Sequence, residues 1–216
     1  MTRLHEVEPR FGPGESQSLA AVIRQLMKRK ARLAGSFLLA IDGRSSSGKS
    51  RLADRIAALL PRTAIVHTDD VAWWHSRFGW DDLLLSGVIE PLRRGDAVDF
   101  RPPAWDERGR QGSISVPDDV DLVVIEGGGA GRASLAPHMD AVIWVQTDLD
   151  LTERRDRERI AAGEIDQEGY EHWMAEEVPF QATERTWERA DLIVAGSSDE
   201  PSNELTVLRG GPHRGS

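Results

Sequence analysis

Residues 37–54 have the sequence FLLAIDGRSSSGKSRLAD, and this stretch decides the fold. Four of its residues, Gly43, Gly48, Lys49 and Ser50, match the pattern G-x-x-x-x-G-K-[ST]. In loops of this kind the backbone N–H groups surround phosphates, the lysine reaches the outer phosphates and the hydroxyl binds Mg²⁺. The pattern therefore predicts a phosphate-binding loop, or P-loop.

The sequence around the loop supports this interpretation. Residues 37–41 form a short apolar run, as expected of a buried parallel strand, and residues 51–60 have helical spacing until Pro61. A flexible Gly/Ser loop is the alternative, but it does not explain why Lys49 and Ser50 stand where a helix N-terminus faces an anion. We expect the nucleotide to be bound by Gly43, Ser45, Ser46, Ser47, Gly48, Lys49, Ser50 and Arg51.

The composition narrows the class of protein. A chain of 216 residues fits one large α/β domain. The net charge of −9 argues against a general nucleic-acid or membrane-surface role, and the absence of cysteine excludes disulfides and thiolate metal sites. No apolar run approaches the ~18 residues that span a bilayer, and the polar N-terminus lacks a signal-peptide core. We expect a cytoplasmic monomer or homodimer without nucleic-acid or membrane partners.

Periodicity along the chain predicts a three-layer P-loop NTPase with a five-stranded parallel sheet. Beyond residues 37–41, strands are expected at 63–68, 121–127, 141–147 and 192–195. Helices are expected from Ser16 to about Leu33, at 149–162 and at 170–189, and the last is expected to point Trp173, Val178, Phe180 and Trp187 inward. We expect an extended N-terminal arm at 1–15, a P-loop domain at 16–197, and a flexible tail at 198–216. Within the domain we expect an irregular excursion at about 71–119 and a lid at about 149–166.

Chemically active side chains follow three of the predicted strands, at the sheet edge where open α/β sheets place their sites. Phosphoryl transfer requires that the phosphates, the metal and the acceptor hydroxyl all be held. Lys49 serves the phosphates, and Ser50 with Glu126 serves Mg²⁺. Asp69 accepts the proton of the acceptor or orients its hydroxyl, with Asp70 as the second choice. The alternatives are an Asx-type turn at the aspartates and a Glu126 bonded to backbone.

Two arginines of the charged helix, Arg155 and Arg159, are four residues apart on one face. That spacing lets both reach the same triphosphate when a lid closes. The alternative is a solvated helix held by i,i+3 and i,i+4 ion pairs.

The excursion supplies the candidates for acceptor binding. Trp73 and Trp105 are suited to stack on a base or sugar, although large aromatic residues are also packing anchors. Asp70, Asp106 and Arg108 are suited to bind hydroxyls. No metal-ligand spacing is present among His67, His75 and His172, so these are expected to be bystanders.

The chain resembles the uridine kinase and phosphoribulokinase family of P-loop kinases over about residues 36–197. The resemblance is carried by GRSSSGKS, the Asp69-Asp70 pair, VVIEG, VQTDLDLTERRDRERI and WERADLIVAG. It implies a nucleoside-kinase-like fold with ATP and Mg²⁺ as cofactors. It also implies Asp69 as catalytic base, Ser50 and Glu126 near Mg²⁺, and Arg155 and Arg159 on the phosphates.

The sequence departs from the family at the acceptor side. Where the family has Asp-x-Phe-Tyr, this chain has Asp69-Asp70-Val71-Ala72, so we expect Trp73 or Trp74 to replace the aromatic pair. We therefore expect an ATP-dependent kinase that phosphorylates a hydroxyl of a small molecule, with nucleosides and sugar-like alcohols as first candidates. The alternative is a nucleotide-binding regulator or slow NTPase switch without an acceptor.

Overall fold

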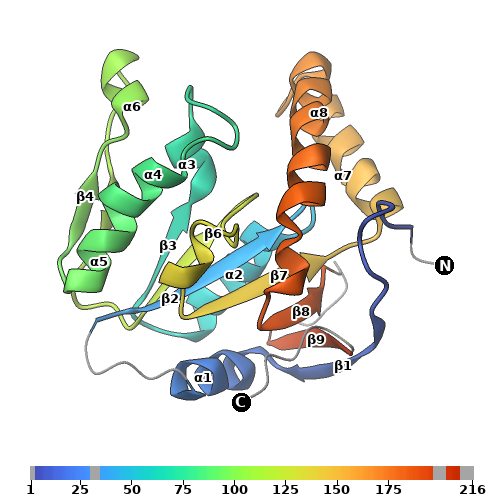
Figure 1. Ribbon diagram of the computed structural model, residues 1–216, viewed down its shortest axis with the longest axis horizontal. Coiled ribbons are helices and arrows are strands. Elements are labelled where there is room, and N and C mark those ends of the chain that lie inside the picture. Colours follow the sequence, from blue (N-terminus) through green and yellow to red (C-terminus); the bar gives the residue numbers. More distant parts are fainter. Residues whose placement is uncertain (1–2, 30–34, 197–202, 210–216) are drawn as a thin grey trace.

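A seven-stranded sheet forms the centre of the protein, which we describe from a computed structural model over residues 3–29, 35–196 and 203–209. The strand order across the sheet is β1-β9-β8-β7-β2-β6-β3 (Figure 1). The strands are β1 (Gly12–Ser18), β2 (Phe37–Gly43), β3 (Thr63–His67), β6 (Leu122–Glu126), β7 (Ala141–Gln146), β8 (Leu192–Ala195) and β9 (Glu204–Arg209).

Five neighbouring strands, β8-β7-β2-β6-β3, run parallel and confirm the predicted parallel sheet. The other two strands extend one edge in the antiparallel sense, because β9 pairs with both β8 and β1. All parallel strands end at the same edge, so the loops after β2, β3 and β6 meet there.

The two edge strands correct two expectations about the termini. Ser16 was expected to cap a helix, but it lies in β1, where its hydroxyl donates to Glu204 at 2.5 Å. The helix begins at Leu19, and the Ser18 hydroxyl accepts the Ala21 N–H. Residues 204–209 were expected to belong to a flexible tail, but they form β9. Asn203 precedes this strand, and the rest of that tail lies outside the described residues.

Helices cover both faces of the sheet (Figure 1). One face packs against α1 (Leu19–Arg29) and α2 (Lys49–Leu59), and the other against α3 (Thr68–Ala72), α4 (Asp81–Leu84), η1 (Leu85–Ile89) and α5 (Glu90–Arg94). The remaining helices are α6 (Pro103–Glu107), η2 (Ala136–His138), α7 (Leu149–Ala161), α8 (Gln167–Glu184) and η3 (Thr186–Glu188). This arrangement is the predicted three-layer α/β architecture.

Strand β2 shows why both faces need helices. Leu38 and Ala40 point into the hydrophobic core under α3–α5, whereas Leu39 and Ile41 point into the core under α1 and α2. Because alternate side chains are apolar on both faces, the strand is buried throughout, as is typical of parallel sheets. The P-loop therefore begins from a rigid, fully buried strand.

The excursion at 71–119 contains more regular structure than expected. Its helical turns join into one run over residues 81–94, and a small antiparallel pair forms from β4 (Val98–Phe100) and β5 (Ile114–Val116). Trp80 and Trp105 are buried in the core that these elements share.

Helix α8 ends earlier than the predicted helix at 170–189. Arg185 adopts a left-handed conformation with φ of 46° and stops the helix. Trp187 is buried as predicted, but from η3, where its ring meets Trp144 edge-on at 5.2 Å. Val178 was expected to point inward and is exposed instead.

Among the described helices, none is long and apolar enough to cross a membrane.

A buried carboxylate ties the P-loop to the rest of the sheet edge. Asp42 is fully buried at the end of β2 and accepts N–H groups of Gly43 at 2.7 Å, Gly129 at 2.8 Å and Gly131 at 3.1 Å. It also accepts the Thr186 hydroxyl at 3.0 Å. Asp42 thereby joins the P-loop to the segment after β6 and to η3.

We expect Asp42→Asn to lower the free energy of unfolding by about 3 kcal/mol, because an amide turns donors toward N–H groups that need an acceptor. Urea denaturation measures this effect. The matched control is Asp121→Asn, which removes a carboxylate that is 57% exposed and should cost less than about 1 kcal/mol. Equal losses from the two variants would contradict the proposed role of Asp42.

Candidate active site

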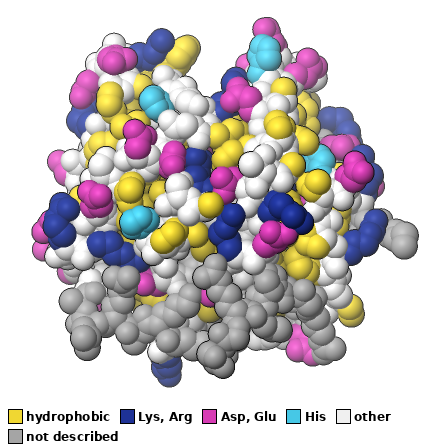
Figure 2. All heavy atoms as spheres, viewed as in Figure 1, with side chains coloured by type: hydrophobic (Ala, Val, Ile, Leu, Met, Phe, Trp, Pro, Cys, Tyr) yellow, Lys and Arg dark blue, Asp and Glu magenta, His cyan; other side chains and the backbone are white. Residues whose placement is uncertain are grey.

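A cavity of about 660 Å³ opens at the carboxyl ends of the parallel strands, and we call it the central cavity. Figure 2 shows the molecular surface hollowed between α8 and the part of the chain that carries α3 and α6. The residues that line the cavity are Ser45, Ser46, Gly48, Lys49, Ser50, Arg51, Leu52, Arg55, Asp69, Glu126, Gly127, Gly128, Val145, Arg155, Glu158, Arg159, Ala162, Glu164, Trp173, Ala195, Gly196 and Leu205.

The P-loop between β2 and α2 has the backbone geometry of an anion-binding loop. Ser46 and Gly48 adopt positive φ values of 54° and 100°, a conformation typical of loops whose N–H groups form an anion-binding concavity. Helix α2 follows, and its N-cap residue Gly48 has no side chain that could cap the first turn; helix N-termini of this kind favour anions. Gly43 does not line the cavity; a Cβ there would lie 2.8 Å from the Val145 carbonyl oxygen, so its role is close packing.

The side chains of the P-loop divide into two groups. Lys49 and Ser50 line the cavity, and the Lys49 ammonium donates to the Arg44 carbonyl oxygen at 2.7 Å across the loop. The Ser47 side chain is buried and does not line the cavity, and its Oγ atom has no hydrogen-bond partner. The loop therefore presents one ammonium group and several hydroxyl groups to whatever enters.

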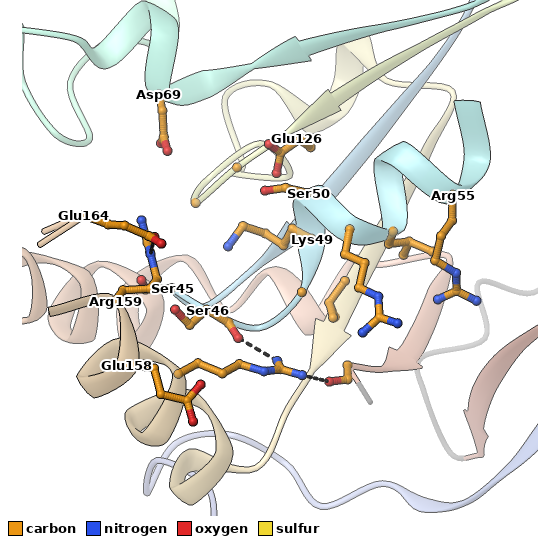
Figure 3. A pocket seen from close by; sticks show the side chains of 18 of the residues that line it. Ser45, Ser46, Lys49, Ser50, Arg55, Asp69, Glu126, Glu158, Arg159 and Glu164 are labelled. Carbon is orange, nitrogen blue, oxygen red and sulfur yellow. Dashed lines mark hydrogen bonds and ion pairs between the residues drawn. The ribbon is translucent and has the colours of Figure 1, made fainter. Parts of the chain in front are cut away.

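Asp69 points into the central cavity from the first turn of α3 (Figure 3). The surrounding protein desolvates its carboxyl group and raises its pKa; the Lys49 ammonium opposes the rise, and the Glu126 carboxylate adds to it. Water still reaches the exposed side chain.

Glu126, at the end of β6, has the chemistry of a metal ligand. Its Oε2 atom is buried without a hydrogen-bond partner, and its Oε1 atom lies 2.5 Å from His67 Nδ1. Ser50 and Glu126 point toward the same part of the cavity (Figure 3). Oxygen ligands of this kind suit Mg²⁺, which keeps several waters and takes further oxygens from phosphates. The residues present therefore fit Mg²⁺.

No group of three or more His, Asp or Glu side chains that could hold a metal ion occurs over residues 3–29, 35–196 and 203–209. A Mg²⁺ ion held by Ser50 and Glu126 would therefore take its remaining ligands from water and phosphate oxygens.

His67 was expected to be a bystander, yet it contacts Glu126. Its pKa is raised, chiefly by the hydrogen bond to that carboxylate. The parallel pairing of β3 with β6 sets His67 directly beside Glu126. The sequence carried no signal for this pair, because neither the strand order nor the register could be known from it.

Helix α7 packs its arginines over the P-loop. Arg155 donates to the Ser46 carbonyl oxygen at 2.8 Å and to the Gly196 carbonyl oxygen at 3.3 Å, and Asp156 accepts the Ser46 hydroxyl at 2.5 Å. Arg159 lines the cavity from the same face and is exposed. The segment expected to form a lid therefore lies in contact with the loop it was expected to cover.

The acceptor-side residues predicted from the excursion do not line the central cavity. Trp105 is 4% exposed and its indole N–H donates to the Asp70 carbonyl oxygen at 2.8 Å, so it is a packing anchor. The Asp70 carboxylate binds Arg110 at 2.5 Å, and that guanidinium stacks on Trp105 with 3.7 Å to the ring centre.

The remaining acceptor-side candidates also have partners within the excursion, outside the cavity lining. Asp106 accepts from Arg101 at 2.7 Å. Arg108 stacks on Trp74 with its guanidinium carbon 3.7 Å from the ring centre, and the Trp73 ring lies edge-on to Trp74 at 6.3 Å. The Arg108–Trp74 contact joins the segment just after Asp69 to the segment around α6.

The cavity wall nearest α8 is formed by residues that were not predicted as site residues from the sequence. Trp173 was expected only as a core residue and lines the cavity with Gly127 and Gly128. Gly127 has φ of 144°, and a Cβ there would lie 1.8 Å from the Thr68 hydroxyl oxygen. The chain thus passes close to the base of α3, which carries Asp69.

No protein-family model matches the sequence, and no curated protein matches it. Similar solved structures include a putative fructose transport system kinase from Silicibacter sp. TM1040, with a TM-score of 0.56, 18% identity and coverage of 81% of this chain and 95% of that one. A D-glycerate 3-kinase from Cryptococcus neoformans has a TM-score of 0.50, 12% identity and coverage of 87% and 97%. A possible uridine kinase from Bacillus stearothermophilus has a TM-score of 0.45, 20% identity and coverage of 80% and 96%. The sheet order and the similarity to the first two structures show that the chain shares their fold, a three-layer α/β fold with a P-loop.

Proposed function

We propose that this protein is an ATP-dependent kinase that transfers the γ-phosphoryl group to a hydroxyl group of a small molecule. One observation carries the proposal: Lys49, Asp69 and Glu126 come from three different strand ends and line one cavity. The kinase fold of the similar structures supports it. A lysine for the phosphates, a carboxylate for the metal and a carboxylate for the hydroxyl are what phosphoryl transfer requires.

The donor half of the site consists of the P-loop and the α7 arginines. The P-loop N–H groups and Lys49 would hold the outer phosphates, and Arg155 and Arg159 would balance charge on the transferred group. Ser50 and Glu126 would hold Mg²⁺, which would neutralise negative charge on the phosphates. Arg155 now bonds to loop carbonyl groups, so it must exchange these partners to reach a phosphate.

The acceptor half depends on Asp69. In the transfer step, an acceptor oxygen forms a bond to the γ-phosphorus while the bond to the β–γ bridging oxygen breaks. The hydroxyl proton moves to an Asp69 carboxylate oxygen, and ADP leaves with the bridging oxygen. Because the pKa of Asp69 is raised, its carboxylate accepts the hydroxyl proton more readily than an ordinary aspartate would.

The acceptor class follows from the resemblance to uridine kinases and from the cavity wall. Nucleosides and sugar-like alcohols present both hydroxyl groups and an apolar face, and Trp173 offers a ring on which such a face can stack. We infer that the protein works in the cytoplasm, where nucleoside triphosphates are available.

An acceptor screen tests the proposal. ADP release is measured with ATP and Mg²⁺ against nucleosides, sugars, vitamins and aminoglycosides, with Lys49→Ala as the inactive control. Release that rises with one acceptor and is absent in the control is the expected result. Release that is indifferent to every acceptor would favour a nucleotide-binding regulator or slow NTPase switch instead.

We expect Glu126→Gln to raise the Mg²⁺ concentration needed for half-maximal turnover by at least about tenfold, because the amide is a weaker ligand. Mg²⁺ titrations at constant ATP measure this value. Glu90→Gln removes an exposed carboxylate on α5, away from the cavity lining, and should leave the value unchanged. A Mg²⁺ requirement that is the same in wild type and Glu126→Gln would remove Glu126 from the metal site.

A further inference from the structure

Helix α8 places a buried carboxylate against the P-loop. Glu177 is 1% exposed, and its Oε1 atom accepts the backbone N–H of Ser45 at 2.8 Å. Ser45 lies within the loop and lines the central cavity (Figure 3). The N–H groups of such loops bind phosphate oxygens. The carboxylate oxygen of Glu177 therefore occupies a position in which a phosphate oxygen could bind.

One peptide group links this oxygen to Lys49: the Arg44 carbonyl oxygen accepts the Lys49 ammonium at 2.7 Å, and the Ser45 N–H of the same peptide donates to Glu177. Burial raises the pKa of Glu177, and the Lys49 ammonium is the strongest influence opposing the rise. Lysines at this position of a P-loop reach the outermost phosphates. A Cβ on Gly128, which lines the cavity, would lie 3.8 Å from Glu177 Oε1. The carboxylate therefore lies just behind the cavity wall and close to the catalytic ammonium.

We propose that Glu177 competes with the outermost phosphate of the nucleotide for the Ser45 N–H and the Lys49 ammonium. The inference rests on the proposed kinase function. In the free protein the carboxylate acts as an internal anion that closes the loop. A triphosphate must displace it or accept a like charge nearby, whereas a diphosphate lacks the group that meets it. Glu177 thus weakens triphosphate binding relative to diphosphate binding.

Glu177→Gln tests the competition. Glutamine has nearly the same volume and keeps an oxygen that accepts the Ser45 N–H, so only the charge is removed. Isothermal titration calorimetry with Mg²⁺ measures Kd for AMP-PNP, a triphosphate analogue that is not hydrolysed, and for ADP. We expect Kd for AMP-PNP to fall about tenfold and Kd for ADP to change less than about threefold.

Glu176→Gln is the matched control. Glu176 is the preceding residue of α8 and pairs with Arg77 on the surface, so its replacement changes the net charge equally without touching the P-loop. Both Kd values should stay at the wild-type level. Thermal unfolding of the free variants verifies that each is folded.

Two outcomes would overturn the proposal. One is a folded Glu177→Gln protein whose ratio of AMP-PNP to ADP Kd equals that of the wild type. If Glu177→Gln does not fold, Glu177→Asp is used, because the shorter side chain draws the carboxylate back from Ser45. Glu177→Asp should shift the ratio of Kd values in the same direction. A ratio in Glu177→Asp equal to that of the wild type is the other overturning outcome. A wild type that binds neither nucleotide would overturn the kinase function itself. If the wild type is active but the Glu177 variant has the same ratio of Kd values, this inference alone is overturned.

Discussion

An Asp69→Asn protein will transfer phosphoryl groups at about one thousandth of the wild-type rate while binding ATP with nearly wild-type affinity. The amide keeps the shape of the side chain but cannot accept the hydroxyl proton. Asp69 is on α3, whereas the loop and arginines that would hold ATP are on β2, α2 and α7, so binding should be spared. Acceptor-dependent ADP release and calorimetry with AMP-PNP measure the two quantities separately.

The pH dependence of the wild-type rate gives a second readout of Asp69. Only the deprotonated carboxylate accepts a proton, and its pKa is raised above that of an ordinary aspartate. The rate should therefore be full above this raised pKa and fall as the pH drops through it, at a higher pH than an unperturbed aspartate would give. The Asp69→Asn protein should lack this decline.

Asp70→Asn is the matched control for Asp69→Asn. Asp70 is the neighbouring carboxylate, and it is engaged by Arg110 outside the central cavity. Its loss should lower the rate less than about tenfold, mainly by loosening that contact. Transfer by Asp69→Asn at a rate comparable to that of Asp70→Asn would remove Asp69 from the mechanism.

Lys49→Ala has the second large expected effect, a loss of at least about a thousandfold in kcat/KM for ATP. The ammonium is the P-loop cation that lies between the loop and the cavity, and it now bonds to the Arg44 carbonyl oxygen. When ATP binds, the ammonium would exchange that oxygen for phosphate oxygens. It would then stabilise the negative charge that develops on them in the transition state. Coupled measurement of ADP release over a range of ATP concentrations measures the loss.

Lys49→Met separates the charge from the aliphatic stem, because Lys49 is only 9% exposed and its stem is packed. The methionine variant should lose as much activity as the alanine variant while unfolding closer to the wild-type temperature. Lys28→Ala, on the exposed face of α1, should change neither quantity. Substantial ATP turnover by Lys49→Met would show that the ammonium is not needed.

The five parallel strands could be predicted because their signals are local. Residues 37–41 and 141–147 are apolar runs of strand length, and the glycines and lysine of the P-loop stand in fixed positions between a strand and a helix. Such patterns depend on contacts within a few residues of the chain. The same logic predicted that Lys49, Ser50, Asp69 and Glu126 would meet at one sheet edge, and these four residues line one cavity, while their roles stay predictions.

The edge strands could not be predicted in this way. Strand β1 is polar and rich in glycine, and its order comes from hydrogen bonds to β9, with Ser16 paired to Thr206. No local pattern records a partner that far along the chain, so residues 12–15 were expected to be an arm and residues 204–209 a flexible tail.

On the acceptor side, the sequence left the role of each tryptophan open for a different reason. The sequence cannot tell whether a tryptophan stacks on a ligand or packs in a core, since both uses favour a large aromatic ring. Tertiary packing places Trp105 in the core and brings Trp173, from a helix expected to face inward, to the cavity wall.

The sequence by itself determined the P-loop, the strands that flank it and the charged groups at their ends, because each follows from the chemistry of a short segment. Only the tertiary structure decided which of those groups share a cavity and which neighbours they meet. His67 reaches Glu126 through strand register, and Glu177 reaches Ser45 across 132 residues through the packing of α8. Contacts of this kind depend on sheet order and helix packing, which the whole chain sets at once.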